Sequence, residues 1–229
     1  MILQKATNQL LTTNMKISVD VKETDTKGRI KEKSYEVLMA KFGEVEKTRM
    51  TIQKPDRAKG ITIIFTHLPD DMGIIEVYTP ANGKTRKMNA TPENIARVGS
   101  NFQLSNYAPT DQNESNCIFL GKQQIDGESC YQLEVTEQSD SFGFKIEFWV
   151  EESTFHIVQI VSFDEDGNQV RIIKLSDFQP INGLKNKIQP MLIQAEDLDS
   201  NMHTRMQVLN ISPQSDLTEE DFSIQGGSE

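Results

Sequence analysis

Cysteine and histidine are scarce in this chain, which holds two cysteines and three histidines among 229 residues. Two cysteines do not make the disulfide framework of a small secreted domain. If both belong to one hairpin that turns at Asp126-Gly127, Cys117 lies opposite a residue near Thr136 and Cys130 opposite one near Gln123. That register does not bring the two thiols together, so we expect both to be unpaired.

The signatures of catalytic and metal sites are also missing. The three histidines, His67, His156 and His203, have no second ligand at metal-binding spacing and are interpreted as structural or surface residues. The chain has no G-x-S-x-G elbow, no P-loop and no G-x-G-x-x-G motif. With no recognisable nucleophile, base, metal or cofactor site, we expect a protein that is not an enzyme.

Basic residues are outnumbered, 24 Lys and Arg against 34 Asp and Glu, which gives a net charge of -10. A nucleic-acid partner would require a basic face, so none is expected. The same charge disfavours loose adsorption to an anionic membrane. No apolar run is long enough to span a bilayer, and no signal peptide is visible at the start. Because the chain starts inside a helical pattern, we expect a mature domain whose signal peptide has been removed.

The dominant pattern is an alternation of apolar and polar residues with a period of two. Between residues 15 and 21 the apolar side chains point one way and Lys16, Ser18 and Asp20 the other. Similar runs recur to residue 211, separated by Asn82-Gly83, Asp126-Gly127 and Asp166-Gly167, which suit tight hairpin turns. The chain is therefore predicted to be mainly β: about a dozen short antiparallel strands in one domain over residues 1–229.

Helices are predicted only around this sheet. Residues 1–13 form an amphipathic N-terminal helix, and the long connection 89–116 contains a short helix over 92–97 with Thr91 as its N-cap. In the tail, 213–229, Ser215 or Asp216 is expected to cap a last turn. Between Phe155 and Phe163 both alternating sets are apolar, which is typical of a strand buried on both faces.

Methionine is plentiful, and Met15, Met39 and Met50 fall on the faces of the first three strands that are predicted to point inward. Methionine side chains adapt to flexible apolar ligands, but they also fill ordinary cores. Composition favours the ordinary core. The stretch "VYTPANGKTRKM" (77–88) poses a similar choice, because Lys84, Arg86 and Lys87 suit either a charged edge strand or the binding of a polar head group.

At these residues the chain resembles the outer membrane lipoprotein-sorting proteins, the LolA-like family. A strand ending in an aromatic residue and proline is followed by a basic strand and then by "GSNF" (99–102). The resemblance extends from about Met15 to Ile211, and the sequence departs from the pattern at Asn101 and Asn106, where acidic residues are common. Further segments match in order: "KPDRAKGITIIF" (54–65), "IDGESCYQLEV" (125–135), "FWVEESTFHIVQIVSFDEDGNQV" (148–170) and the threonine of "MHTRMQV" (202–208).

The resemblance implies a strongly curved, half-open antiparallel β-barrel with helices forming a lid over an apolar cavity. It implies a periplasmic carrier that binds acyl chains of lipoproteins or lipids and moves them towards the outer membrane, with inner- and outer-membrane transfer proteins as partners. The alternative is an envelope binding or stress-sensing module of the same fold. The expected cavity lining is Met15, Ile17, Val19, Val37, Met39, Met50, Ile52, Ile63, Phe65, Ile75 and Val77, with Phe102 and Leu104 as gate residues and Lys84, Arg86 and Lys87 at the rim.

Overall fold

The structure is a computed structural model that describes residues 2–10, 14–68, 71–91, 94–95, 115–137 and 145–224. Contacts between Cα atoms divide the chain into two compact units. Unit 1 comprises Met1–Leu11, Lys22–Lys31 and Ser105–Gln207, and unit 2 comprises Thr12–Val21, Glu32–Leu104 and Val208–Glu229. The prediction of one LolA-like domain over residues 1–229 stays a prediction.

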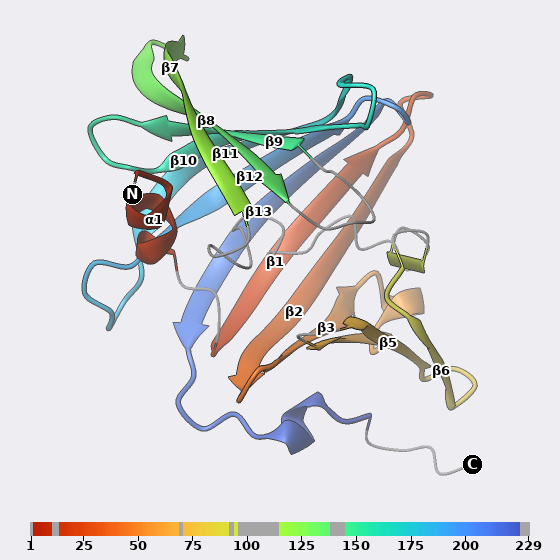
Figure 1. Ribbon diagram of the computed structural model, residues 1–229. Coiled ribbons are helices and arrows are strands. Elements are labelled where there is room, and N and C mark those ends of the chain that lie inside the picture. The colour runs from red at the N-terminus through yellow and green to blue at the C-terminus, as the bar shows by residue number, and fades with distance from the viewer. Residues whose placement is uncertain are drawn as a thin grey trace. The chain divides into compact units, whose positions relative to one another are not determined.

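The chain is mainly β, as predicted. In the described parts of the chain, thirteen strands form one antiparallel sheet in the order β6-β5-β4-β3-β2-β1-β13-β12-β11-β10-β9-β8-β7 (Figure 1). Within the described residues β6 and β7 end this order, so the sheet is not closed into a barrel. The strands are β1 (Met15–Thr24), β2 (Ile30–Phe42), β3 (Val45–Lys54), β4 (Thr62–Leu68), β5 (Asp71–Thr79), β6 (Lys84–Asn89), β7 (Ser115–Ile125), β8 (Glu128–Glu137), β9 (Lys145–Glu151), β10 (Ile157–Phe163), β11 (Gln169–Pro180), β12 (Ile188–Asp197) and β13 (Met202–Pro213).

The predicted hairpin turns occur where the sequence places them. Asp126 and Gly127 both have positive φ, 49° and 94°, the conformation of a two-residue turn that matches the twist of the strands. Gly83 and Gly167 have positive φ in the two other predicted turns. Consecutive strands can therefore pair antiparallel with short connections.

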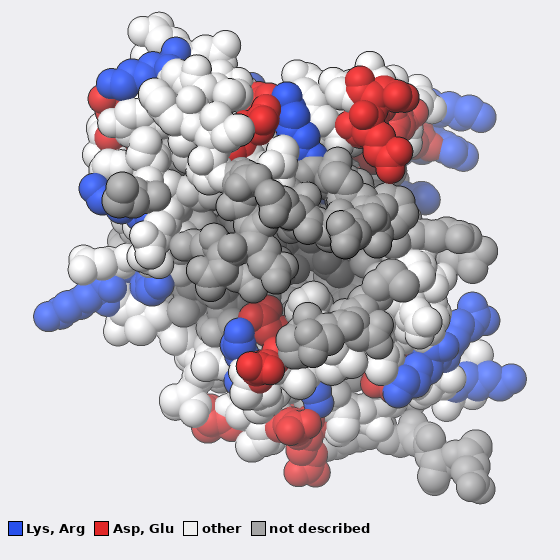
Figure 2. Space-filling model, in the orientation of Figure 1, with Lys and Arg blue, Asp and Glu red and all other residues white. Residues whose placement is uncertain are grey.

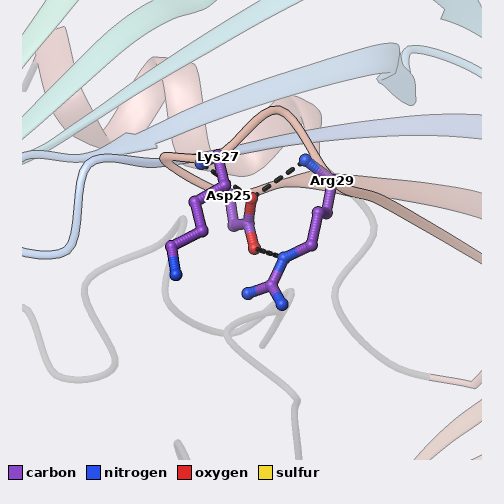
Figure 3. A network of polar contacts seen from close by, with 3 residues as sticks. All are labelled: Asp25, Lys27 and Arg29. Carbon is purple, nitrogen blue, oxygen red and sulfur yellow. Dashed lines mark hydrogen bonds and ion pairs between the residues drawn. The ribbon is translucent and has the colours of Figure 1, made fainter.

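Asp25 organises the turn between β1 and β2 (Figure 3). Its carboxylate accepts hydrogen bonds from the main-chain N–H groups of Lys27 and Arg29, each at 2.9 Å, and from Arg29 Nε at 2.6 Å. The main-chain N–H of Arg29 contributes most to lowering the pKa of Asp25. The turn is thus closed by local hydrogen bonds rather than by packing.

The β7–β8 hairpin differs by one residue from the predicted register. Cys130 lies opposite Gln123, as expected, but Cys117 lies opposite Val135 instead of Thr136. The reason is a β-bulge between Phe119 and Gly121, which adds one residue to β7. Both thiols are free, as predicted, with Cys117 exposed and Cys130 buried.

Unit 1 has apolar side chains on both faces of its central strand. On one face, Val161 and Phe163 of β10 pack in a cluster with Cys130 and Trp149. On the other, Ile160 lies between Phe148 and Ile173. A register shift between Ile157 and Gln159 interrupts the alternation of β10. The burial on both faces that the sequence predicts for 155–163 is confirmed.

A short helix, α1 (Ile2–Gln9), packs on unit 1 through buried Leu3 and Ala6. Of the helix predicted over 1–13, Leu10 is not helical, and residues 1 and 11–13 lie outside the described residues. Its C-terminal end is held by Lys187, whose Nζ donates to the carbonyls of Asn8 at 2.7 Å and Leu10 at 2.9 Å. A cation here complements the exposed carbonyls of a helix end.

The C-terminal tail packs on unit 2. A short 3₁₀ helix, η3 (Glu219–Phe222), buries Phe222, whose ring meets that of Phe42 edge-on with centroids 5.6 Å apart. Thr218 caps the helix through a reciprocal pair of hydrogen bonds with Asp221. The predicted cap at Ser215 or Asp216 was therefore wrong. In the capping box, the side chains of Thr218 and Asp221 each accept a hydrogen bond from the main-chain N–H of the other residue.

The start of the predicted helix in the 89–116 connection is also seen. The N–H of Asn94 donates to Thr91 Oγ1 at 3.3 Å, and the N–H of Ile95 donates to the Thr91 carbonyl at 2.9 Å. Thr91 is therefore the N-cap that the sequence predicts. Among the described residues, no helix is both long enough and apolar enough to cross a membrane.

Candidate functional site

The predicted lining residues of β2, β3, β4 and β5 form a continuous apolar face on unit 2, because the strand register aligns them. Residues directly opposite one another in antiparallel strands point to the same face. One row runs from Val37 through Met50, Ile63 and Val77 to Arg86. These five residues come from β2, β3, β4, β5 and β6 in turn.

A second row lies beside the first. It contains Met39, Thr48, Phe65, Ile75 and Met88, again one residue from each of the five strands. Thr48 is the one polar member. We call the face that carries both rows the apolar face of unit 2.

Most of the predicted lining is buried. Val77 is half-buried, while Phe102 and Leu104 and the "GSNF" segment lie outside the described residues. The buried members are Met15, Ile17, Val19, Val37, Met39, Met50, Ile52, Ile63, Phe65 and Ile75. Burial fits a ligand-binding face and an ordinary core equally well, so the role of these residues stays a prediction.

The opposite face of unit 2 is occupied by the tail. Arg49 Nη1 donates to the main-chain carbonyl of Asp221 at 2.8 Å, and Lys47 forms an ion pair with Glu219 at 3.0 Å. Arg49 lies opposite Ile64 in β4, the neighbour of Ile63. Successive residues of a strand point to opposite faces, so the tail packs away from the apolar face.

The three predicted rim cations lie on β6, at one end of the sheet, and all are exposed. Figure 2 shows Lys and Arg side chains gathered over this strand. Arg86 is opposite Val77 and Lys84 opposite Thr79, so both belong to the apolar face. Lys87 is opposite Glu76, with its Nζ 4.0 Å from Glu76 Oε1, and belongs to the other face. The register therefore brings two of the three cations together.

Unit 1 has an apolar face that the prediction of lining residues left out. Phe148, Ile160 and Ile173 are buried and lie opposite one another across β9, β10 and β11. The row continues to Ala195 in β12, and buried Ile193 lies two residues away, opposite Leu175. The signal in the sequence was the doubly apolar run at 155–163. The bulge between Ile157 and Gln159 changes which residues of β10 share a face, so the alternation alone could not assign them.

The histidines show no metal site. Within the described part of the chain, no three His, Cys, Asp or Glu side chains are grouped to hold a metal ion. The ring of His156 stacks on Phe178 with centroids 4.2 Å apart, and burial lowers its pKa. His67 and His203 are exposed.

Comparisons with known proteins agree with this architecture. A protein-family model described as "Uncharacterized protein" matches residues 44–225. No curated protein is significantly similar in sequence.

Three solved structures are similar over almost the whole chain. A domain from Vibrio parahaemolyticus described as an outer membrane lipoprotein-sorting protein has a TM-score of 0.79 at 13% identity, covering 96% of this chain and 94% of its own. A DUF1329 family protein from Desulfovibrio piger has a TM-score of 0.80 at 17% identity, covering 97% and 95%. A LolA superfamily protein from Nitrosomonas europaea has a TM-score of 0.69 at 20% identity, covering 97% and 96%. At such identities the likeness establishes a shared fold.

Proposed function

We propose that this chain is a non-enzymatic carrier of acyl chains. The premise is that the chain belongs to the family matched over residues 44–225 and has the LolA-like fold. The acyl chains belong to lipoproteins or lipids, and the carrier works in the periplasm and moves them towards the outer membrane. Inner- and outer-membrane transfer proteins are its proposed donors and acceptors. A helical lid over an enclosed cavity is part of the proposal.

The apolar face of unit 2 is the observation that carries the proposal. Its first row puts aliphatic and methionine side chains side by side over four strands, from Val37 to Val77, with no charged residue between them. An acyl chain gains about 0.8 kcal/mol for each methylene removed from water. A face of this length and composition can therefore shelter a hydrocarbon chain that would otherwise be exposed to water during transfer.

Methionine suits this face to cargo of more than one shape. Met39 and Met50 are both buried there, and Met15 of β1 is buried as well. Their unbranched side chains have three rotatable bonds and can repack around chains of different length or branching. A core that serves stability alone is better filled by residues with fewer rotamers.

The row that begins at Val37 ends in a cation. Arg86 is exposed and opposite Val77, so the apolar row is followed at the sheet edge by a guanidinium group. A guanidinium binds phosphate or carboxylate oxygens through paired hydrogen bonds. We therefore propose that Arg86, with Lys84 on the same face, holds an anionic head group whose acyl chain lies along the row.

Two adjacent isoleucines allow a matched test. Ile63 belongs to the apolar face and Ile64 to the face that the tail covers, and both are buried. Phenylalanine at either position overfills a packed site and costs about 1–3 kcal/mol. We expect Ile63→Phe to reduce the acyl ligand that is recovered by solvent extraction, relative to Ile64→Phe of similar melting temperature. Equal recovery from both variants would show that the apolar face does not hold the ligand.

The alternative function is a module of the same fold that senses lipid or protein in the envelope without transporting it. Exposed apolar side chains on β7, described below, favour it, because they provide a surface for protein contact. A transfer assay separates the two functions. The carrier moves a fluorescent acyl lipid between donor and acceptor vesicles, whereas the sensor binds the lipid and leaves its distribution unchanged.

A further inference from the structure

The two edges of the sheet are chemically different. β6 carries the exposed cations Lys84, Arg86 and Lys87, and charged side chains on an edge strand discourage pairing with another chain. β7, at the other end of the order, carries the sequence Cys-Ile-Phe-Leu at 117–120, and all four residues are exposed. The β6 edge is therefore protected by charged side chains against pairing with another chain, and the 117–120 part of the β7 edge is not.

The exposure of β7 is large for apolar side chains. Ile118, Phe119 and Leu120 are 50%, 55% and 46% exposed. Phe119 is opposite Leu133 and Ile118 opposite Glu134, so apolar side chains leave β7 on both faces of the sheet. An apolar pattern on both faces is typical of a strand that is covered by other parts of a structure, and it is unusual for an exposed edge.

The edge also carries little charge. Within Ser115–Ile125 the one charged residue is Lys122, and its Nζ is paired with a carboxylate oxygen of Glu152. The same carboxylate accepts hydrogen bonds from Ser129 Oγ at 3.1 Å and Tyr131 Oη at 3.2 Å. The apolar part of β7 can therefore approach an identical strand without bringing like charges together.

We propose that two copies of this chain associate by pairing their β7 edges antiparallel, which joins two sheets into one. Antiparallel pairing about a two-fold axis is self-complementary, because each copy offers the same groups to the other. The bulge after Phe119 limits the regular, apolar part of the strand to residues 117–119. Pairing is therefore centred on Ile118, which lies opposite its own copy, while Cys117 lies opposite Phe119.

This register satisfies the side chains and the backbone together. Phe119 covers a small thiol side chain across the interface, and the two Ile118 side chains meet on the other face. The outward N–H and C=O groups of β7, which no described strand pairs, gain partners. Because each copy has a net charge of -10, added salt screens the repulsion between copies and strengthens the association.

Light scattering after size exclusion tests the proposal on the full chain over a range of concentrations and at low and high salt. We expect a mass that rises to twice that of one chain, more readily at high salt. Ile118→Lys and Phe119→Lys should each give monomers. Leu209→Lys, at a leucine that is 56% exposed on β13, should dimerise like the parent protein. A parent protein that is monomeric at every concentration, or dimers that both edge variants retain, would overturn the proposal.

Crosslinking tests the register and does not depend on the lysine variants folding well. In a Cys117→Ser background, Ile118→Cys places two thiols opposite each other, within the Cα separation that a disulfide needs. Mild oxidation should give a crosslinked dimer. Lys84→Cys in the same background, on the β6 edge, should stay monomeric, and Cys130 is buried in both. Equal crosslinking of the two variants would refute pairing through β7, and capture of an extended apolar peptide without self-association would assign the edge to another partner.

Discussion

Arg86 of β6 lies directly opposite Val77 of β5, so its side chain leaves the sheet on the face that carries Val37, Met50 and Ile63. Lys87, the next residue along, leaves on the other face beside Glu76. Arg86 and Lys87 are thus both exposed, but Arg86 lies on the apolar face that is proposed to bind the acyl chain and Lys87 lies on the other face.

This difference predicts unequal effects of charge reversal on lipid binding. Arg86→Glu places a carboxylate at the end of the apolar row and should weaken binding of an anionic lipid by about tenfold or more, because an attraction becomes a repulsion. Lys87→Glu makes the same change in net charge on the other face and should have little effect. Titration of the delipidated protein with anionic and zwitterionic fluorescent lipids measures both. Equal loss in the two variants would mean that net charge, not position on the apolar face, controls binding.

The tail should contribute to the stability of unit 2 through Phe222. This side chain is buried against Phe42, and its truncation to alanine should lower the free energy of unfolding by about 3 kcal/mol. Glu219→Gln removes an ion pair whose carboxylate is 70% exposed and should cost less than about 0.5 kcal/mol. Urea unfolding of the two variants provides the measurement. Similar losses would contradict a tail held mainly by its aromatic contact.

Stability should fall in mildly acidic solution because of His156. Burial against Phe178 lowers the pKa of His156 below the ordinary value of 6.5, and this outweighs the nearby Glu151. As the pH falls through 6.5 the unfolded chain takes up a proton that the folded chain does not, so the free energy of unfolding decreases below that pH and is unaffected above it. His156→Phe keeps an aromatic ring on Phe178 and should flatten this part of the profile. Urea midpoints between pH 7.5 and 5.5 measure the slope, and an unchanged slope in the variant would assign it to other groups.

The two cysteines should differ in reactivity towards thiol reagents. Cys117 is exposed on β7 and Cys130 is buried beneath Trp149 and Val161. Desolvation raises the pKa of both thiols, so even Cys117 should react slowly at neutral pH and faster in alkaline solution. One thiol should titrate in the folded protein at concentrations where it is monomeric, and two should titrate in urea. Two equally reactive thiols without urea would contradict the burial of Cys130.

The sequence predicted the regular parts of the fold because each of them depends on residues that are close together in the chain. Period-two alternation located β1, β2 and β3, and the residues that accept positive φ located the turns at Gly83, Gly127 and Gly167. Thr91 was predicted as a cap because the capping geometry depends on neighbours three residues away. These features follow from the chain within a few residues.

Other features required contacts that sequence alternation does not contain. The bulges at Leu120 and in β10 change which residues share a face, and one inserted residue inverts every later assignment. The separation of Lys87 from Arg86 follows from the register of β5 and β6. The contacts of Arg49 with the tail join residues 172 positions apart. Ten of the predicted lining residues are nevertheless buried, because hydrophobic alternation reports burial directly.

Native mass spectrometry of the purified protein, before and after extraction with solvent, tests the acyl-carrier proposal most directly. The account predicts a bound species whose fragments contain acyl chains, its loss on extraction, and its restoration when the extracted protein is mixed with an acyl lipid. A protein that carries no such ligand, and that takes up none after extraction while it remains folded, would contradict the account.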